Sequence, residues 1–208
     1  MRKLLTILLI FGLLSRLLGQ SPQASSPDAN SKIETIVFVR HGEKPVAGLG
    51  QLTCQGLNRA LALPKVLITK FGKPNNIYAP DPTGKVDGSP GKFDYVRPLA
   101  TIEPTAIRLG MPVNCDFRFD NIKALESELL NPSHKGQLLF VAWEHLKLND
   151  MVKDLLKMQG GDPAQVPDWP NDDYDRIYVL RLNSGTNSIS FSLDHENLND
   201  LSKECPGA

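Results

Sequence analysis

The chain has 208 residues, which is enough for one well-cored domain with a long loop or two. An apolar fraction of 41% is ordinary for a globular protein, so the composition favours a packed core over disorder. Lys and Arg together number 23 and balance 23 Asp and Glu. This balance gives no support to a nucleic-acid-binding surface or to binding at an acidic membrane surface, and we expect no nucleic acid partner.

The N-terminal residues have the pattern of a secretory signal peptide. A short basic start precedes an apolar run from Leu4 to Leu14, and small, polar and proline residues follow. We expect residues 1–24 to be the signal and its cleavage region, residues 25–32 a flexible lead, and residues 33–208 the domain. The alternative is an uncleaved anchor, but Arg16 interrupts a run that is already short for a membrane span. The sequence therefore predicts a secreted or periplasmic protein with no stable membrane anchor.

The chain has three cysteines, Cys54, Cys115 and Cys205. In an exported protein they allow one disulfide and one free thiol, and the sequence does not indicate which two pair. There is no Cys-x-x-Cys or His-Glu-x-x-His motif to suggest zinc. We expect neither a metal site nor a cofactor.

The predicted domain begins with an apolar strand from Ile33 to Val39, typical of the centre of a parallel sheet that is covered on both faces. Residues 52–72 then predict a helix with Thr53 as its N-cap, a break or kink at Pro64, and its end at Gly72. We expect the apolar side of this helix to carry Leu57, Ala60 and Leu61.

The middle of the chain alternates between short elements and loops. Asn75 to Ala79 predicts a short strand, and Pro80 to Asp94 an insertion-like loop rich in Pro, Gly, Asp and Lys. Residues 111–119 alternate as a strand does. Residues 121–130 predict a helix with one apolar face, formed by Ile122, Leu125 and Leu129.

The last third contains another apolar strand, Gln137 to Trp143, and a helix over residues 148–161 that ends at glycines. Residues 175–193 predict a hairpin around Asn183 to Thr186. The alternation of strands and helices predicts an α/β fold: a three-layer α/β/α sandwich with a mostly parallel central sheet.

In such sheets ligands bind beyond the carboxyl ends of the strands. The first strand places Arg40 and His41 there, and the strand that ends at Trp143 places Glu144 and His145 there. Arg97 precedes a proline, and a proline at the first helical position would make Arg97 the cap residue of a helix whose N-terminus favours anions. Two arginines and two histidines at one edge predict a phosphate-binding site that contains a nucleophile.

These residues carry a resemblance to the histidine phosphatase superfamily, which has a phosphoglycerate mutase-like fold. "RHGE" at Arg40–Glu43 resembles the family's opening signature, and Leu52–Ala60, "LTCQGLNRA", resembles its LTxxGxxQA pattern. "RPLAT" at Arg97–Thr101 resembles R-A-x-x-T, and His145 stands where the family has its second histidine. The resemblance extends from about Ile33 to Leu193.

The resemblance implies a metal-independent, acid-type phosphatase mechanism. His41 would attack phosphorus and become phosphohistidine, while Arg40, Arg97 and His145 would hold the phosphoryl oxygens. A leaving alkoxide needs a proton, which the family usually takes from a carboxylic acid. Leu146 follows His145 where the phytase-like branch has aspartate, so Glu144 becomes the candidate acid. Glu126 and Glu128 are the next candidates for this acid.

The sequence gives other polar residues structural roles. Glu126 and Glu128 lie off the apolar face of their helix and are expected on a solvated surface, and His134 and His195 lie in polar loops. Glu43 either pairs with its neighbour Lys44 or orients Arg40 or His41; the sequence leaves both open.

Three functions remain in competition at this point. The leading one is a phosphomonoester hydrolase acting on a small phosphorylated metabolite or a phosphoprotein. A phosphomutase is disfavoured because export removes the chain from sugar-phosphate pools. The third is a phosphate-binding or interaction module that kept the site and lost turnover.

Overall fold

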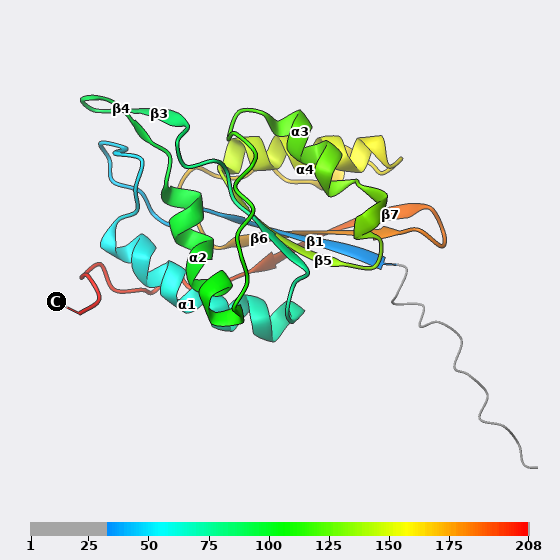
Figure 1. The fold of residues 1–208 in the computed structure, drawn as a ribbon, viewed down its shortest axis with the longest axis horizontal. Helices are drawn as coiled ribbons and strands as arrows, with labels where there is room; N and C mark the ends of the chain where they lie inside the picture. The colour runs from blue at the N-terminus through cyan, green and yellow to red at the C-terminus, as the bar shows by residue number, and fades with distance from the viewer. Residues whose placement is uncertain (1–32, 208) are drawn as a thin grey trace, which may run out of the picture.

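The computed structural model describes residues 33–207, so the predicted signal peptide and flexible lead lie outside the described residues. A five-stranded sheet, in the order β2-β5-β1-β6-β7, lies between α1 and α2 on one side and α3 and α4 on the other (Figure 1). The strands are β1 (Ile33–Arg40), β2 (Asn76–Tyr78), β3 (Lys85–Gly88), β4 (Gly91–Asp94), β5 (Leu138–Trp143), β6 (Arg176–Asn183) and β7 (Ser188–His195). The helices are α1 (Cys54–Phe71), α2 (Arg97–Leu109), α3 (Ile122–Leu129) and α4 (His145–Met158), with 3-10 turns η2 (Pro132–His134) and η3 (Pro163–Gln165).

The strand directions confirm the predicted, mostly parallel sheet. β2, β5 and β1 are parallel to one another, and β6 is antiparallel to both β1 and β7. β7 therefore runs in the same direction as β1, and β6 alone runs the other way. In the β1–β5 register Arg40 faces Trp143, so the carboxyl ends of the two central strands lie side by side.

The apolar character of β1 follows from its two buried faces. Ile36 and Phe38 pack with residues of α3 and α4, whereas Val37 and Val39 pack with residues of α1 and α2. Successive side chains of a strand point to opposite faces, so a central strand between two helical layers must be apolar throughout. This confirms the three-layer sandwich.

The helix α1 begins and ends as predicted. The side chain of Thr53 accepts a hydrogen bond from the Gly56 backbone N–H, and Gly72 ends the helix at φ 89°, in the left-handed region that favours glycine. Of the break or kink predicted at Pro64, the break is wrong, because the helix continues through this residue to Phe71. Pro64 is buried on the same face as Leu63 and Leu67, and this packing offsets the backbone hydrogen bond that proline cannot make.

The expected apolar side of α1 is only partly right. Leu57 and Leu61 are exposed, whereas Ala60 is buried and Leu63 and Leu67 pack with residues of the sheet. The buried face of α1 therefore differs from the predicted one, because the contacts of α1 with the rest of the fold decide which of its side chains are buried.

Two predictions for the middle of the chain need correction. Residues 111–119 form no strand; only Asn114 makes a bridge, to Tyr78 of the short edge strand β2. The loop from Pro80 to Asp94 carries a two-stranded hairpin, β3–β4, that stands apart from the main sheet (Figure 1). The β6–β7 hairpin around Asn183 and the apolar face of α3 are confirmed.

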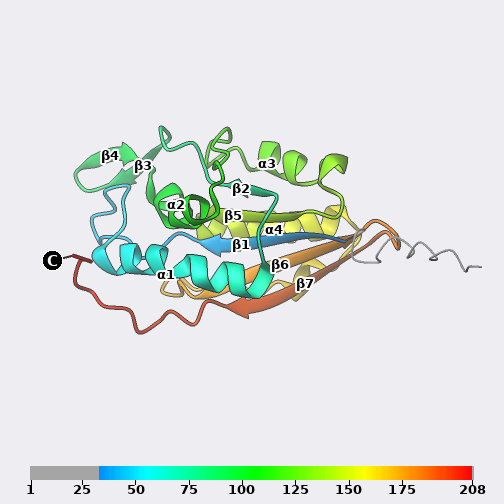
Figure 2. The ribbon, with the colours of Figure 1, turned by 60° about the horizontal axis from the view of Figure 1, so that its bottom comes forward.

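The structure joins Cys54, the first residue of α1, to Cys205, and Cys115 is a free, half-buried thiol. After β7 the chain returns beside α1 and ends near its N-terminal end (Figure 2). Within residues 33–207, no helix is long and apolar enough to cross a membrane.

Candidate active site

The predicted site residues meet at the carboxyl ends of β1 and β5. The backbone N–H of His41 donates to the carbonyl of Trp143 at 3.0 Å, which ties the end of one strand to the end of the other. α4 begins at His145, with only Glu144 between it and β5, three residues earlier than predicted. This early turn allows Glu144 and His145 to lie at the same edge, although successive residues of a strand would point to opposite faces.

His41 is held as a neutral imidazole with one nitrogen free to attack. Its Nδ1 lies 2.8 Å from the carbonyl oxygen of Gly42, and because a carbonyl only accepts, the proton must be on Nδ1. Burial, together with the positive charges of Arg97 and Arg40, lowers the pKa of His41 to about 3. The lone pair of Nε2 is therefore available at neutral pH.

Arg40 is 1% exposed, and the segment between η3 and β6 covers it and binds its guanidinium. Its Nη1 donates to the carbonyls of Asn171 at 2.9 Å and Asp173 at 2.7 Å, and its guanidinium stacks 3.8 Å from the ring centroid of Tyr174. The Nε of Arg40 is buried and has no acceptor among the described residues. Arg40 is thus a fixed cation whose buried Nε is an unused donor.

Arg97 is the first residue of α2, so the prediction that it caps this helix is wrong; Val96 is the cap residue. Its Nη1 donates to the Gly48 carbonyl at 2.9 Å, and its guanidinium lies 4.8 Å from the ring centroid of Tyr95. Its Nε is also buried without an acceptor in the part of the chain that the structure describes. An anion at this edge would satisfy donors of both arginines.

Glu144 and His145 form a pair at the start of α4. The carboxylate of Glu144 caps the helix by accepting from the N–H groups of Leu146 at 3.1 Å and Lys147 at 3.0 Å, and its Oε1 lies 2.6 Å from Nδ1 of His145. Burial would raise the pKa of Glu144, but the hydrogen bonds from His145 and the backbone outweigh it and lower the pKa to about 2. At neutral pH this carboxylate holds no proton to donate.

Asn171 connects His145 to Arg40. Its side-chain oxygen lies 2.7 Å from Nε2 of His145, and its backbone carbonyl accepts from Arg40. Asn171 therefore links the second histidine to the Arg-His pair. Among residues 33–207, no group of three His, Cys, Asp or Glu side chains is arranged to hold a metal ion.

Comparisons with known proteins identify the fold. No family model matches the chain, and no curated protein matches it significantly in sequence. Solved structures do match: a phosphoglycerate mutase from Plasmodium falciparum has 15% identity and a TM-score of 0.52, covering 77% of this chain and 89% of its own. A mycobacterial glucosyl-3-phosphoglycerate phosphatase, solved with inorganic phosphate, has 15% identity and a TM-score of 0.51, covering 77% of this chain and 95% of its own. The chain has a phosphoglycerate mutase-like fold.

A third structure with this phosphoglycerate mutase-like fold comes from Nakamurella multipartitia and was assigned as a phosphohistidine phosphatase, SixA. It has 14% identity and a TM-score of 0.52, and the match covers 78% of this chain and 96% of that one.

The other two candidate acids, Glu126 and Glu128, make their contacts away from His41 in the phosphoglycerate mutase-like fold. Glu126 is 2% exposed, so the prediction of a solvated position is wrong; it packs under Lys123, whose Nζ lies 2.9 Å from Oε2, and burial raises its pKa. Glu128 is half-buried and accepts from Tyr78 at 3.0 Å, while its Oε1 lies 3.1 Å from Nε2 of His134. Neither carboxylate is a neighbour of the Arg-His pair.

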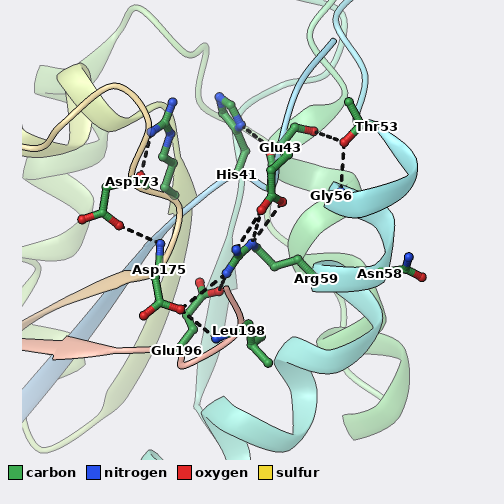
Figure 3. Close-up of polar contacts among 12 residues, drawn as sticks. His41, Glu43, Thr53, Gly56, Asn58, Arg59, Asp173, Asp175, Glu196 and Leu198 are labelled. Atoms are coloured by element: carbon green, nitrogen blue, oxygen red, sulfur yellow. Dashed lines mark hydrogen bonds and ion pairs between the residues drawn. The ribbon is translucent and has the colours of Figure 1, made fainter. Parts of the chain in front are cut away.

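Among the described residues, the carboxylate of Glu43 forms no ion pair with Lys44 or Arg40. Its carboxylate accepts from Arg59 of α1, at 2.8 Å from Nη2, directly behind His41 (Figure 3). The loop that carries His41 is therefore fixed to α1.

Sequence reasoning missed the aromatic residues of the site. Tyr95 is fully buried, its hydroxyl has no partner among the described residues, and its ring lies edge-on to His41 with centroids 6.2 Å apart. Burial raises the pKa of Tyr95, so its hydroxyl keeps its proton and can donate to an anion. Its position two residues before Arg97 was an available signal. Tyr174 and Asn171 had none, since only the fold brings residues 170–174 over Arg40.

Proposed function

We propose that this chain is a member of the histidine phosphatase superfamily and hydrolyses phosphomonoesters through a covalent phosphohistidine on His41. The observation that carries this proposal is the neutral His41, with its proton on Nδ1, beside two arginines that keep unused donors. The similarity in fold to phosphatases and a phosphoglycerate mutase supports it.

In the first step the lone pair on Nε2 of His41 forms a bond to phosphorus, and the bond between phosphorus and the leaving oxygen breaks. Arg40 and Arg97 hold the phosphoryl oxygens, with Tyr95 as a further donor. Phosphoryl transfer depends mainly on such positioning and charge neutralisation. Water then attacks phosphorus, its proton is released, and the electron pair of the N–P bond returns to Nε2.

The leaving oxygen must also be neutralised. Glu144 caps α4 and has a pKa of about 2, so we assign it to the orientation of His145 and not to proton donation. A site without a protonated general acid favours phosphate compounds whose leaving group departs with little protonation, such as aryl phosphates. We therefore propose that aryl phosphates are hydrolysed faster than alkyl phosphates.

The proposal also includes a substrate class and a location for the protein. We propose a small phosphorylated metabolite or a phosphoprotein as substrate. Export to an oxidising compartment is supported by the Cys54–Cys205 disulfide, because disulfides persist in secreted and periplasmic proteins.

Transient labelling tests the nucleophile. Brief exposure to a radiolabelled phosphomonoester should leave acid-labile, alkali-stable phosphate on the wild type and none on His41→Ala, with both proteins folded by circular dichroism. Activity should survive EDTA, because Arg40 and Arg97 already supply the charge for the phosphoryl group. Label that persists on His41→Ala would remove His41 from the nucleophile role. Label that passes to a second acceptor and not to water would indicate a phosphomutase.

A further inference from the structure

A buried arginine lies behind His41 and is shared by three segments of the chain. Arg59 of α1 is 1% exposed, and its Nε and Nη2 both donate to Glu43, at 2.8 to 3.2 Å (Figure 3). Its Nη1 donates to Glu196 at 2.6 Å, just after β7, and lies 3.7 Å from Asp175, just before β6. One guanidinium therefore fixes the loop after β1 to the far edge of the sheet.

The loop held by Arg59 is the one that orients the nucleophile. Glu43 is two residues from His41, and its backbone carbonyl accepts from the Thr53 N–H at 2.8 Å. A Cβ on Gly56 would lie 2.5 Å from the same carbonyl, so this loop and α1 are in close backbone contact. The residue between, Gly42, provides the carbonyl that accepts from Nδ1 of His41.

The cluster is built to hold one cation. Glu196 is 2% exposed as a residue, and its Oε1 has no partner among the described residues. Burial raises the pKa of Glu196, and Arg59, whose Nη1 donates to Oε2 of this carboxyl group, opposes the rise. Arg59 is thus the cation that faces the carboxyl groups of Glu43, Asp175 and Glu196.

The C-terminal segment keeps Glu196 in place. The Glu196 N–H donates to the Asp175 carbonyl at 2.7 Å, and the side chain of Asn58 donates to the carbonyls of Ser202 and Glu204. The Cys54–Cys205 disulfide ends this segment at the start of α1.

We propose that Arg59 is a positioning residue for His41: by holding Glu43, with Glu196 as its second anchor, it fixes the Gly42–Glu43 peptide and thereby the ring of His41. This proposal rests on the proposed function. Arg59 stands where the LTxxGxxQA pattern has glutamine, and a neutral glutamine could not act as the ion-pair partner of Glu43 and Glu196.

Replacing Arg59 by glutamine removes the cation and keeps a polar side chain. We expect Arg59→Gln to lower kcat by about 10- to 100-fold with little change in KM, the effect of a misplaced catalytic group. Arg59→Lys keeps the charge without the planar fork and should recover part of the loss.

The double variant Arg59→Gln/Glu196→Gln separates positioning from stability. It removes the buried carboxyl group of Glu196 that Arg59→Gln leaves without its partner, so part of the thermal stability lost in Arg59→Gln should return. Because Glu43 is still not held, kcat should stay low. If kcat returns together with stability, Arg59 is a structural residue and the proposal is overturned.

A measurement on the His41 ring keeps this test independent of activity. Histidine nitrogen NMR at neutral pH should show a proton on Nδ1 in the wild type, and this signal should shift or exchange faster in the double variant. An unchanged signal would overturn the proposal. A wild type that shows the Nδ1 proton but turns over no phosphomonoester would instead contradict the proposed function, while the comparison of His41 signals would still decide the role of Arg59.

Discussion

The substitution Glu144→Gln separates two roles for this residue, helix cap and proton donor. In the structure Oε1 and Oε2 accept one backbone N–H each at the start of α4. Glutamine has one acceptor oxygen, so one of these bonds is lost, together with a negative charge at a helix N-terminus. Cap losses cost about 1 kcal/mol and the charge about 0.5 kcal/mol. For a domain of this size the sum of about 1.5 kcal/mol corresponds to a fall in Tm of roughly 3–6 °C.

The pH dependence of stability gives a second signature. The folded-state pKa of Glu144 is about 2, below its ordinary value of 4.5, so its contribution to stability is fully present above pH 4.5 and is lost as the pH falls through that window. Thermal unfolding followed by circular dichroism at several pH values should show this loss in the wild type and a smaller one in Glu144→Gln.

Kinetics on two substrate classes complete the test. If Glu144 acts as a cap that orients His145, Glu144→Gln should slow the hydrolysis of aryl and alkyl phosphates by the same factor, about tenfold or less. The control Asp162→Asn removes the charge at the cap of η3, where the side chain accepts from the Ala164 N–H at 2.9 Å, and should leave both rates unchanged. A selective loss of 10²–10⁴-fold on alkyl phosphates, with Tm unchanged, would refute this reasoning and make Glu144 the acid.

Three further substitutions probe the site. Arg97→Ala should lower kcat/KM by about 10²–10³-fold, because it removes a preorganised charge partner, and a change below threefold would show that Arg97 does not hold the phosphoryl group. Tyr95→Phe should lower kcat/KM by about tenfold, the scale of one lost hydrogen bond, while Tm stays the same or rises because a buried hydroxyl without a partner is removed; unchanged kinetics would show that the phenol contacts no substrate. Gly42→Ala would place a Cβ 2.8 Å from the Gly56 carbonyl oxygen, and the displaced loop should cost about 10²-fold in kcat. Its control, Gly84→Ala, meets atoms only at 3.3 Å and should be nearly neutral, so equal effects of the two would contradict the assignment.

Several features could be read from the sequence because local physics determines them. An unbroken apolar run must be a strand covered on both faces, which is what β1 is. Thr53 and Gly72 bound α1 because capping and left-handed geometry are properties of single residues. The rule that ligands bind at the carboxyl ends of parallel strands was enough to select Arg40, His41, Glu144 and His145.

Tertiary structure alone decided how these residues act. The sequence placed Glu144 beside His145 but did not contain the turn that makes its carboxylate a helix cap and lowers its pKa. It could not show that Glu126 is buried, because burial depends on which surface α3 meets. Nor could it bring Arg59 to Glu196, or Asn171 to Arg40, across separations of 137 and 131 residues. Chemical type and local geometry belong to the residue, whereas burial, charge state and partners belong to the packed chain, because each depends on groups distant in sequence.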